Sequence, residues 1–293
     1  MTQTQMPQTD PKEAIGFMNI DETDFRSMTR QQHLRHLEVE GYVVFPEILD
    51  AETIARLKRE LADADMGHTN YSKNQTRSTT QPQWHSRAVA ELIGYPPMIG
   101  FLTDLMGPDI VFTRGFFQRT QPGCPGISIH TDGQPHGSDL FGYEGSCPRL
   151  VRVLYYLDDL TSDRAPFRLI PRSHLSFHGQ ANPYVRYKSH PEEITITAPA
   201  GSAVVVPSMV LHGSHSNKDA KPRELVQLGY RPAWAGPVQP VDEWDPQLVA
   251  DVPDIAKPFL QPLNTSGAQW VQPHKPEGMA TEAPGINPSR WGD

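Results

Sequence analysis

The sequence predicts a mainly β protein with flanking helices, an α+β fold in which a helical layer covers one side of a β core. Apolar residues recur at helical spacing in the first hundred residues, and from Asp109 onward short β-rich segments alternate with Gly, Pro and Asp. The 293 residues, 37% of them hydrophobic, suffice for one large domain and show no internal repeat. We therefore predict a single domain over 25–234, with a helical layer over 25–108 and a β core over 109–234.

The N-terminal part is expected to be mostly helical. Residues 1–24 are polar and lack apolar periodicity, which predicts a mobile arm. Apolar spacing predicts helices over 25–40, from Asp50 to Leu61 and over 88–106, with a short strand at 42–46. Asp50 is the predicted N-cap of the second helix. The polar stretch 67–87 has no periodicity, so we expect a long loop that closes over a ligand as a lid.

The β core is expected to be a sandwich or barrel, because its strands are short and separated by turn residues. The predicted strands cover residues 110–119, 126–130, 150–157, 167–170, 193–198, 202–206 and 224–231. The tail over 235–293 is Pro-rich and aperiodic. We predict that it wraps over the core in irregular form, with Trp244, Trp270 and Trp291 as docking points.

Charge and composition argue against several classes of function. The net charge of −8, the pI near 5.8 and the scattered Lys and Arg side chains argue against a nucleic-acid partner. Cys124 and Cys147 are too few for a disulfide framework, which favours a reducing compartment. Neither a secretory signal nor a membrane anchor is recognisable near Met1, so a cytoplasmic protein without a membrane partner is expected. The sequence does not indicate an oligomeric state.

The segment from Ser128 to Gly133 contains the first candidate metal ligands. On an extended strand, side chains two residues apart point to the same side, so His130 and Asp132 can reach one point together. Such a triplet also arises by chance, and His212, which follows an apolar strand, supplies the context. Two histidines and one carboxylate suit a non-haem Fe(II) centre with three open coordination positions, and the same ligands suit Zn.

Arg223 helps to separate these two possibilities. It opens a predicted strand eleven residues beyond His212, and alternation places Arg223, Leu225 and Gln227 on one face. A guanidinium inside an apolar barrel is costly unless it is paired, and no acidic residue shares that face of the strand. A bound carboxylate would satisfy it, because the planar fork of Arg matches a carboxylate bidentately.

Several motifs follow one another in a fixed order between residues 30 and 232. They are Gly41-Tyr42-Val43-Val44-Phe45-Pro46, Gln121-Pro122-Gly123, Leu157-Asp158-Asp159-Leu160, the run from Phe167 to His174, and His212-Gly213-Ser214 with Arg223 beyond it. With these motifs the chain resembles the phytanoyl-CoA dioxygenase (PhyH-like) branch of the Fe(II)/2-oxoglutarate-dependent oxygenases. Arg172 and Ala165 stand where Gly is usual in that family, so we expect both turns to differ in backbone shape.

The resemblance implies a double-stranded β-helix, the jelly-roll core that is shared with cupins. It implies Fe(II) on His130, Asp132 and His212, with 2-oxoglutarate chelating the metal and O2 as the oxidant. The far carboxylate of 2-oxoglutarate is then expected on Arg223 and Ser214. His174 is interpreted as a structural residue of its turn.

Other polar residues are candidates for lining a pocket. Alternation places Phe112, Arg114, Phe116 and Gln118 on one face of their strand. If this face points inward, Gln118 would contact 2-oxoglutarate and Arg114 the substrate. Arg152 shares a face with Tyr156, and both are candidates for contacting the substrate. For Arg152 the alternative to lining the pocket is a structural ion pair.

The expected function is hydroxylation, or another oxidation, of an aliphatic C–H bond, with decarboxylation of 2-oxoglutarate to succinate. The expected substrate is a free small molecule anchored by Arg152 or Arg114, because the sequence offers no basic surface for the phosphates of a CoA thioester. One alternative is a cupin-like metal isomerase or hydrolase that works without 2-oxoglutarate. Another is a non-catalytic barrel that binds a small molecule.

Overall fold

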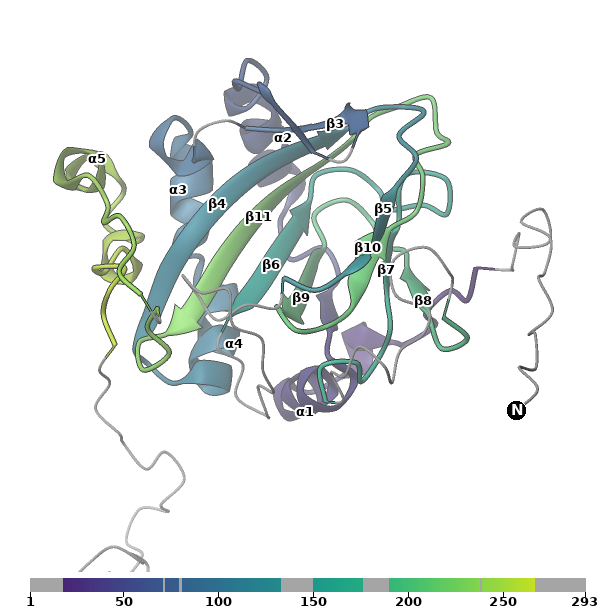
Figure 1. Ribbon diagram of the computed structural model, residues 1–293, viewed down its shortest axis with the longest axis horizontal. Helices are drawn as coiled ribbons and strands as arrows, with labels where there is room; N and C mark the ends of the chain where they lie inside the picture. The colour runs from purple at the N-terminus through teal and green to yellow at the C-terminus, as the bar shows by residue number, and fades with distance from the viewer. Residues whose placement is uncertain are drawn as a thin grey trace, which may run out of the picture.

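Two antiparallel β-sheets form the centre of the molecule (Figure 1). The computed structural model describes residues 18–70, 72–78, 81–132, 150–175, 190–237 and 239–266. Within them, a seven-stranded sheet has the order β1-β9-β6-β11-β4-β3-β2, and a four-stranded sheet has the order β5-β10-β7-β8. The strands are β1 (Val43–Phe45), β2 (His68–Asn70), β3 (Ser72–Arg77), β4 (Ile110–Thr120), β5 (Ile127–His130), β6 (Val151–Tyr156), β7 (Phe167–Leu169), β8 (Ile194–Ile196), β9 (Ala203–Pro207), β10 (His212–Ser214) and β11 (Arg223–Pro232).

The chain passes repeatedly between the two sheets from β4 onward. The strands β4, β6, β9 and β11 lie in the large sheet, while β5, β7, β8 and β10 lie in the small one. Every strand predicted from Ile110 onward is present within two residues of its expected ends. The structure adds β10, whose three residues His-Gly-Ser carry no apolar alternation that would have revealed a strand.

Helices cover the large sheet on the face that points away from the small sheet, except that the first helix lies beside the edge strand β1 (Figure 1). They are α1 (Arg30–Glu40), α2 (Ala51–Glu60), α3 (Arg87–Ile93) and α4 (Pro96–Met106), with a 3-10 turn η1 (Phe25–Ser27) before α1. Asp50 caps α2 as predicted, because its carboxylate accepts a hydrogen bond from the Thr53 N–H at 2.7 Å. Gly41 ends α1 with φ of 85°, a left-handed conformation that favours glycine.

The single helix predicted over 88–106 is in fact two helices. The first ends at Ile93 and the second begins at Pro96. The two consecutive prolines that open α4 have no N–H to continue the hydrogen bonding of α3, and they suit the first turn of a new helix. The apolar periodicity of the sequence continues across the break between the two helices. The sequence pattern therefore does not reveal that the helix is interrupted.

A bulge in β4 decides which side chains face the small sheet. The register between β4 and β11 shifts between Gly229 and Tyr230, where Gly229 pairs with Arg114 and Tyr230 with Phe112. The Tyr230 hydroxyl donates a hydrogen bond to the Ile93 carbonyl at 3.1 Å, on the side of the large sheet where the helices lie. The Phe112 ring packs against the Tyr230 ring on that side. The prediction that Phe112 shares a face with Arg114 is therefore wrong, because the extra residue reverses the alternation.

The prediction of an irregular loop over 67–87 is also wrong. Strands β2 and β3 form a hairpin there, and β3 pairs with β4 from Gln75 opposite Thr120 to Arg77 opposite Gln118. A 3-10 helix η2 (Pro82–Trp84) follows. Main-chain hydrogen bonds to the edge of β4 hold this segment, so its strands form without apolar alternation. The expected lid is thus largely an extension of the sheet.

The two ends of the chain are described only in part. Most of the expected arm lies outside the described residues, but residues 18–24 belong to the ordered fold: Ile20 bridges Thr195 beside β8, and Asp21 accepts a hydrogen bond from the Tyr42 hydroxyl at 3.0 Å. Trp270 and Trp291 also lie outside them. No helix in the described part of the chain is long and apolar enough to cross a membrane.

The described part of the tail contains α5 (Pro246–Asp251) and the 3-10 helix η3 (Lys257–Phe259). Trp244 packs against Trp84 and Phe112, as the docking prediction requires. Arg231 at the end of β11 is fully buried and donates hydrogen bonds to four carbonyls, including those of Leu263 and Thr265. A single guanidinium therefore fastens the tail to the large sheet.

Candidate metal centre

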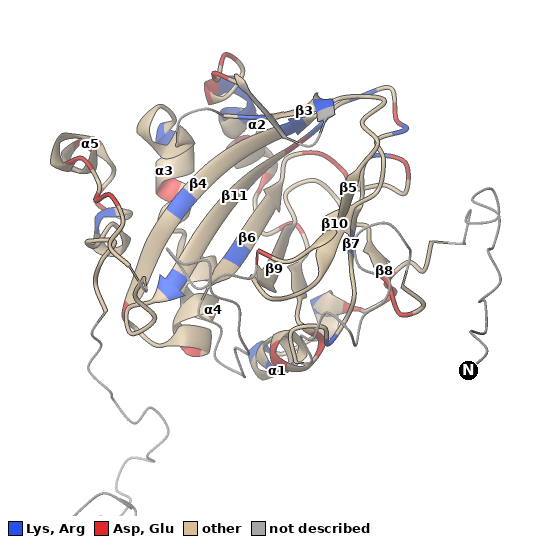
Figure 2. Cartoon of the chain, viewed as in Figure 1, with Lys and Arg blue, Asp and Glu red and all other residues tan. Residues whose placement is uncertain are grey.

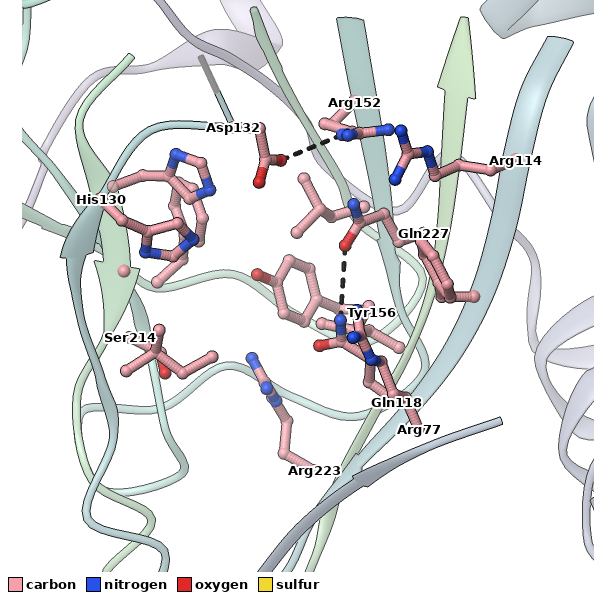
Figure 3. Close-up of a pocket in the computed structure, with 17 residues that line it drawn as sticks. Arg77, Arg114, Gln118, His130, Asp132, Arg152, Tyr156, Ser214, Arg223 and Gln227 are labelled. Atoms are coloured by element: carbon pink, nitrogen blue, oxygen red, sulfur yellow. Dashed lines mark hydrogen bonds and ion pairs between the residues drawn. The ribbon is translucent and has the colours of Figure 1, made fainter. Parts of the chain in front are cut away.

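The three predicted metal ligands meet at one point between the sheets. His130 ends β5, Asp132 follows it, and His212 opens β10, where it lies directly opposite His130 in the antiparallel pairing. Their ligand atoms all lie within 4.8 Å of one another. Figure 3 shows His130 and Asp132 turned toward the same space. The spacing predicted from the sequence is therefore realised in the fold.

Hydrogen bonds orient both imidazole rings. The Nδ1–H of His130 donates to the Ser128 carbonyl at 2.8 Å, and that of His212 donates to the Val210 carbonyl at 2.8 Å. Each ring is thereby fixed in the tautomer whose Nε2 carries a lone pair. This is the usual way in which a protein prepares a histidine to bind a metal. The ring of Phe167 stacks on His212 with centroids 5.5 Å apart and restrains it further.

The protonation states also suit a cation. Burial, together with the neighbouring His130, lowers the pKa of His212 to about 4. Although burial alone would raise the pKa of Asp132, Arg152 and the two histidines hold it well below its usual range. At neutral pH the centre therefore offers a neutral imidazole at His212 and an ionised carboxylate. A divalent cation fits this donor set, which is of the kind that Fe(II) and Zn sites use.

A second polar cluster lies at another end of the same pocket, around Arg223. This residue is 2% exposed, and its guanidinium donates to the Thr120 hydroxyl at 2.7 Å and lies over the Tyr156 ring. Its Nε, the Ser214 Oγ and the Tyr156 hydroxyl are buried without hydrogen-bond partners among the described residues. Burial raises the pKa of Tyr156 to about 12, so its hydroxyl remains a donor. A buried guanidinium with an unpaired Nε and two unpaired hydroxyls beside it form a site for an anion.

The pocket that joins the two clusters has a volume of about 200 Å³. The remaining predicted residues, Gln118, Arg114, Arg152 and Tyr156, all line it, so of the two orientations left open for Gln118, Arg114 and Arg152 the inward one is found. Gln118 contacts Gln227 across the strands, with the amide atoms 3.5 Å apart (Figure 3). Arg152 fulfils both interpretations offered for it, because it lines the pocket and also pairs with Asp132.

Sequence reasoning missed Arg77, which lines the pocket from β3. Its guanidinium lies over the Phe116 ring, 5.0 Å from the centroid. Arg77 comes from the hairpin for which the sequence predicts a loop. Its position therefore depends on the pairing of β3 with β4, which leaves no periodic signal in the sequence.

Two turns have a backbone conformation that favours glycine. Ala165 and Arg172 have φ of 45° and 63°, although neither is glycine. A positive φ costs a residue other than glycine roughly 1–2 kcal/mol. Whether these turns differ in backbone shape from those of the family stays a prediction. His174 is buried and bonds the Glu38 carbonyl at 2.8 Å through Nε2, in agreement with its predicted structural role.

Solved structures similar to this chain include HygX and two non-haem alpha ketoglutarate-dependent enzymes. HygX from Streptomyces hygroscopicus, solved with nickel and 2-oxoglutarate bound, is 18% identical with a TM-score of 0.61 over 76% of this chain and 94% of HygX. The alpha ketoglutarate-dependent epimerase SnoN from nogalamycin biosynthesis is 16% identical with a TM-score of 0.57 over 70% of this chain and 81% of SnoN. The carbocyclase SnoK from the same biosynthesis is 16% identical with a TM-score of 0.58 over 72% of this chain and 87% of SnoK. At such low sequence identities, the structural similarity establishes the fold of this chain.

The sequence itself also matches a known family. No curated protein shows a significant match to the chain. A comparison with family sequences, however, matches residues 37–225 to phytanoyl-CoA dioxygenase (PhyH), a segment that contains all three candidate metal ligands and Arg223. Since this segment covers more than half of the 293 residues, the chain belongs to the phytanoyl-CoA dioxygenase (PhyH) family.

Proposed function

We propose that the chain is an Fe(II)/2-oxoglutarate-dependent oxygenase that hydroxylates an aliphatic C–H bond of a small molecule and converts 2-oxoglutarate to succinate. The observation that carries this proposal is the presence, in one pocket, of the ligand set His130, Asp132 and His212 and of the buried cation Arg223. A metal centre alone would also suit a hydrolase. A buried guanidinium surrounded by unsatisfied donors needs an anionic co-substrate.

The fold supports the same proposal. The strands of the core alternate between two facing sheets in the order that a double-stranded β-helix requires, and we assign that architecture to residues 109–234. The family match over 37–225 lies within the single domain expected over 25–234. HygX, SnoN and SnoK support this reaction class, since structures of the first two contain a metal and 2-oxoglutarate or alpha ketoglutarate.

Each side chain has a defined task in this proposal. His130, Asp132 and His212 would hold Fe(II), which together with 2-oxoglutarate and O2 supplies the oxidising chemistry when bound. Arg223 would bind the distal carboxylate of 2-oxoglutarate bidentately, with the Ser214 and Tyr156 hydroxyls donating to the same oxygens. Gln118 lies in the adjoining wall as a further donor to the co-substrate.

The pocket also has to position the substrate and exclude water. Apolar side chains from both sheets, including Phe116, Leu154 and Phe167, form walls between the two polar clusters. Such walls hold a C–H bond near the metal and keep bulk water from it. Because SnoN is an epimerase and SnoK a carbocyclase, the fold alone does not select hydroxylation, and our assignment rests on its being the simplest oxidation of this class.

Succinate release tests the proposal directly. Purified protein is incubated with 2-oxoglutarate, with and without Fe(II), and binding of 2-oxoglutarate to the metal-loaded protein is measured in parallel. We expect metal-dependent binding and Fe(II)-dependent succinate formation, both lost in His212→Ala. A cupin-like isomerase or hydrolase would bind the metal without binding 2-oxoglutarate, and a non-catalytic barrel would form no succinate; either result would overturn the proposal.

A further inference from the structure

Two arginines and a glycine form a row across the centre of the large sheet. Strand β11 lies between β4 and β6, and its Gly229 pairs with Arg114 on one side and with Arg152 on the other. Figure 2 shows the basic positions within β4 and β6. Figure 3 shows both guanidinium groups reaching into the pocket at the end where Asp132 lies, away from Arg223.

Gly229 provides the room for these side chains. A Cβ at this position would lie 2.6 Å from the Arg152 Nη1 and 2.8 Å from the Thr113 Oγ1, both closer than real Cβ contacts. The Arg114 Cγ lies 3.5 Å from the same point. The absence of a side chain at Gly229 therefore lets two cationic side chains occupy adjacent space above one strand.

Among the described residues, only part of the charge in this row is balanced. Arg152 is 4% exposed, and its Nε is bound to Asp132, but its buried Nη1 has no hydrogen-bond partner among the described residues. Arg114 is half-buried and forms neither an ion pair nor a hydrogen bond with any residue that the structure describes. Burial and the nearby Arg152 lower the pKa of Arg114 to about 10, which reflects the cost of keeping both charges here.

The described lining of the pocket has the same excess. Arg114, Arg152 and Arg223 each contribute a guanidinium group, whereas Asp132 contributes the one carboxylate among the described lining residues. A divalent metal and doubly charged 2-oxoglutarate cancel one another, so loading the site leaves this excess in place. A further anion would reduce it.

We propose, resting on the proposed function, that the primary substrate is a small organic anion whose carboxylate, phosphate or sulfate group binds between Arg114 and the Arg152 Nη1. Such a group accepts several charge-assisted hydrogen bonds from two guanidinium forks. Thr120 pairs with Arg223 at one end of β4, and Arg114 lies six residues away along the same strand. Six residues of strand correspond to about 20 Å. The substrate and co-substrate anions are thus held at opposite ends of the pocket, and the carbon that is oxidised lies on the part of the substrate that extends from its anion toward the metal.

Anion titrations of the loaded protein test this site. The full chain is loaded with Ni(II) and 2-oxoglutarate, so that Arg223 is occupied, and is titrated calorimetrically with sodium sulfate and separately with sodium acetate. We expect saturable binding of at least one anion. Binding of sulfate alone would indicate that the substrate is a phosphate or sulfate ester, and binding of acetate alone would indicate that it is a carboxylic acid. Arg114→Gln should raise the dissociation constant at least tenfold. Saturable binding of neither anion would overturn the proposal.

Two further variants separate this site from a general effect of positive charge. Arg119→Gln removes the same charge from β4, but Arg119 pairs with Glu224 and does not line the pocket, so binding should change less than twofold. Gly229→Ala removes no charge, yet its Cβ displaces the Arg152 guanidinium and should weaken anion binding about tenfold. Equal effects of Arg114→Gln and Arg119→Gln, or unchanged binding in a folded Gly229→Ala protein, would overturn the proposal.

A separate measurement distinguishes failure of this inference from failure of the proposed function. The affinity of the same Ni(II)-loaded preparations for 2-oxoglutarate is determined first. If the wild type does not bind 2-oxoglutarate, the proposed function itself is wrong. If 2-oxoglutarate binds with similar affinity to the wild type and to Arg114→Gln, and neither anion binds, only the substrate assignment is wrong.

Discussion

The Arg152 guanidinium and the Asp132 carboxylate form an ion pair inside the pocket, with Nε 3.0 Å from Oδ2. Arg152 projects from near the start of β6, and Asp132 lies just beyond the end of β5, so the pair connects the two sheets at the metal centre. The Asp132 N–H also donates to the Ser208 carbonyl at 2.8 Å. Both the backbone and one carboxylate oxygen of Asp132 are therefore fixed, and the other oxygen is left for a metal.

We predict that Arg152 positions the metal ligand. In Arg152→Ala the Asp132 carboxylate loses its orienting partner, and the affinity for the metal should fall roughly 10- to 100-fold, the usual effect of removing such an outer hydrogen bond. Calorimetric titration of the apoprotein with Ni(II) measures this. The control is Arg114→Gln, which removes a nearby charge but no contact to Asp132, and should not weaken metal binding. Equal losses in the two variants would show that Arg152 acts only through its charge.

The three ligands are predicted to act together. His130→Ala and His212→Ala each remove one donor, and each should abolish stoichiometric Ni(II) or Fe(II) binding at micromolar protein. Asp132→Glu keeps the charge but is one methylene longer, so its oxygen leaves the position that the two imidazoles define and binding should also fail. The control is His33→Ala, on α1 and outside the pocket. Full metal affinity in any of the three ligand variants would contradict this assignment.

Arg223 is predicted to bind the distal carboxylate of 2-oxoglutarate. Removing one partner of a buried charge pair costs about 2–5 kcal/mol, so Arg223→Ala should raise the half-saturating concentration of 2-oxoglutarate at least about tenfold. Affinity for Ni(II) in the absence of 2-oxoglutarate should stay unchanged, because Arg223 does not contact the ligands. Arg223→Lys restores the charge without the planar fork and should recover only part of the loss. An unchanged half-saturating concentration in Arg223→Ala would refute the role.

The sequence alone predicts those features of the fold and the site that depend on local patterns along the chain. Strands with alternating or continuous apolar residues, such as β6 and β9, were predicted within two residues of their ends. The metal ligands could be recognised because His130 and Asp132 share a strand face and His212 follows a well-defined apolar strand. Arg223 could be recognised because a buried cation needs an anionic partner, and its own strand supplies none.

The features that were missed depend on pairing between distant segments. The polar hairpin that includes Arg77 is held by backbone pairing of β3 with β4. No pattern of side chains in the sequence indicates that this pairing forms. The bulge that separates Phe112 from Arg114 inserts one residue into an otherwise regular strand. The Arg114–Gly229–Arg152 row is invisible for the same reason, since it exists only in the register of three strands that are far apart in the sequence.

The last prediction concerns the stability of the metal-free protein in mild acid. Burial, together with Arg168 and Lys218, lowers the pKa of His215 to about 4, and the neutral ring shares a hydrogen bond with the Thr195 hydroxyl at 2.9 Å. In the unfolded chain the pKa of this histidine returns to its ordinary value near 6.5. Between pH 6.5 and pH 4 the unfolded state therefore binds the proton and the folded state does not, so the free energy of unfolding falls as the pH is lowered.

From pH 7 to pH 5 this single group should remove about 2 kcal/mol of stability. His215→Gln cannot titrate, and its free energy of unfolding, measured by urea denaturation at both pH values, should lose about that much less than the wild type. The matched control is Thr195→Val, which removes the hydrogen bond but keeps the buried histidine, so it should be less stable at both pH values and retain the full pH dependence. A His215→Gln protein with the same pH dependence as the wild type would show that the ring at position 215 accepts a proton without disturbing the fold.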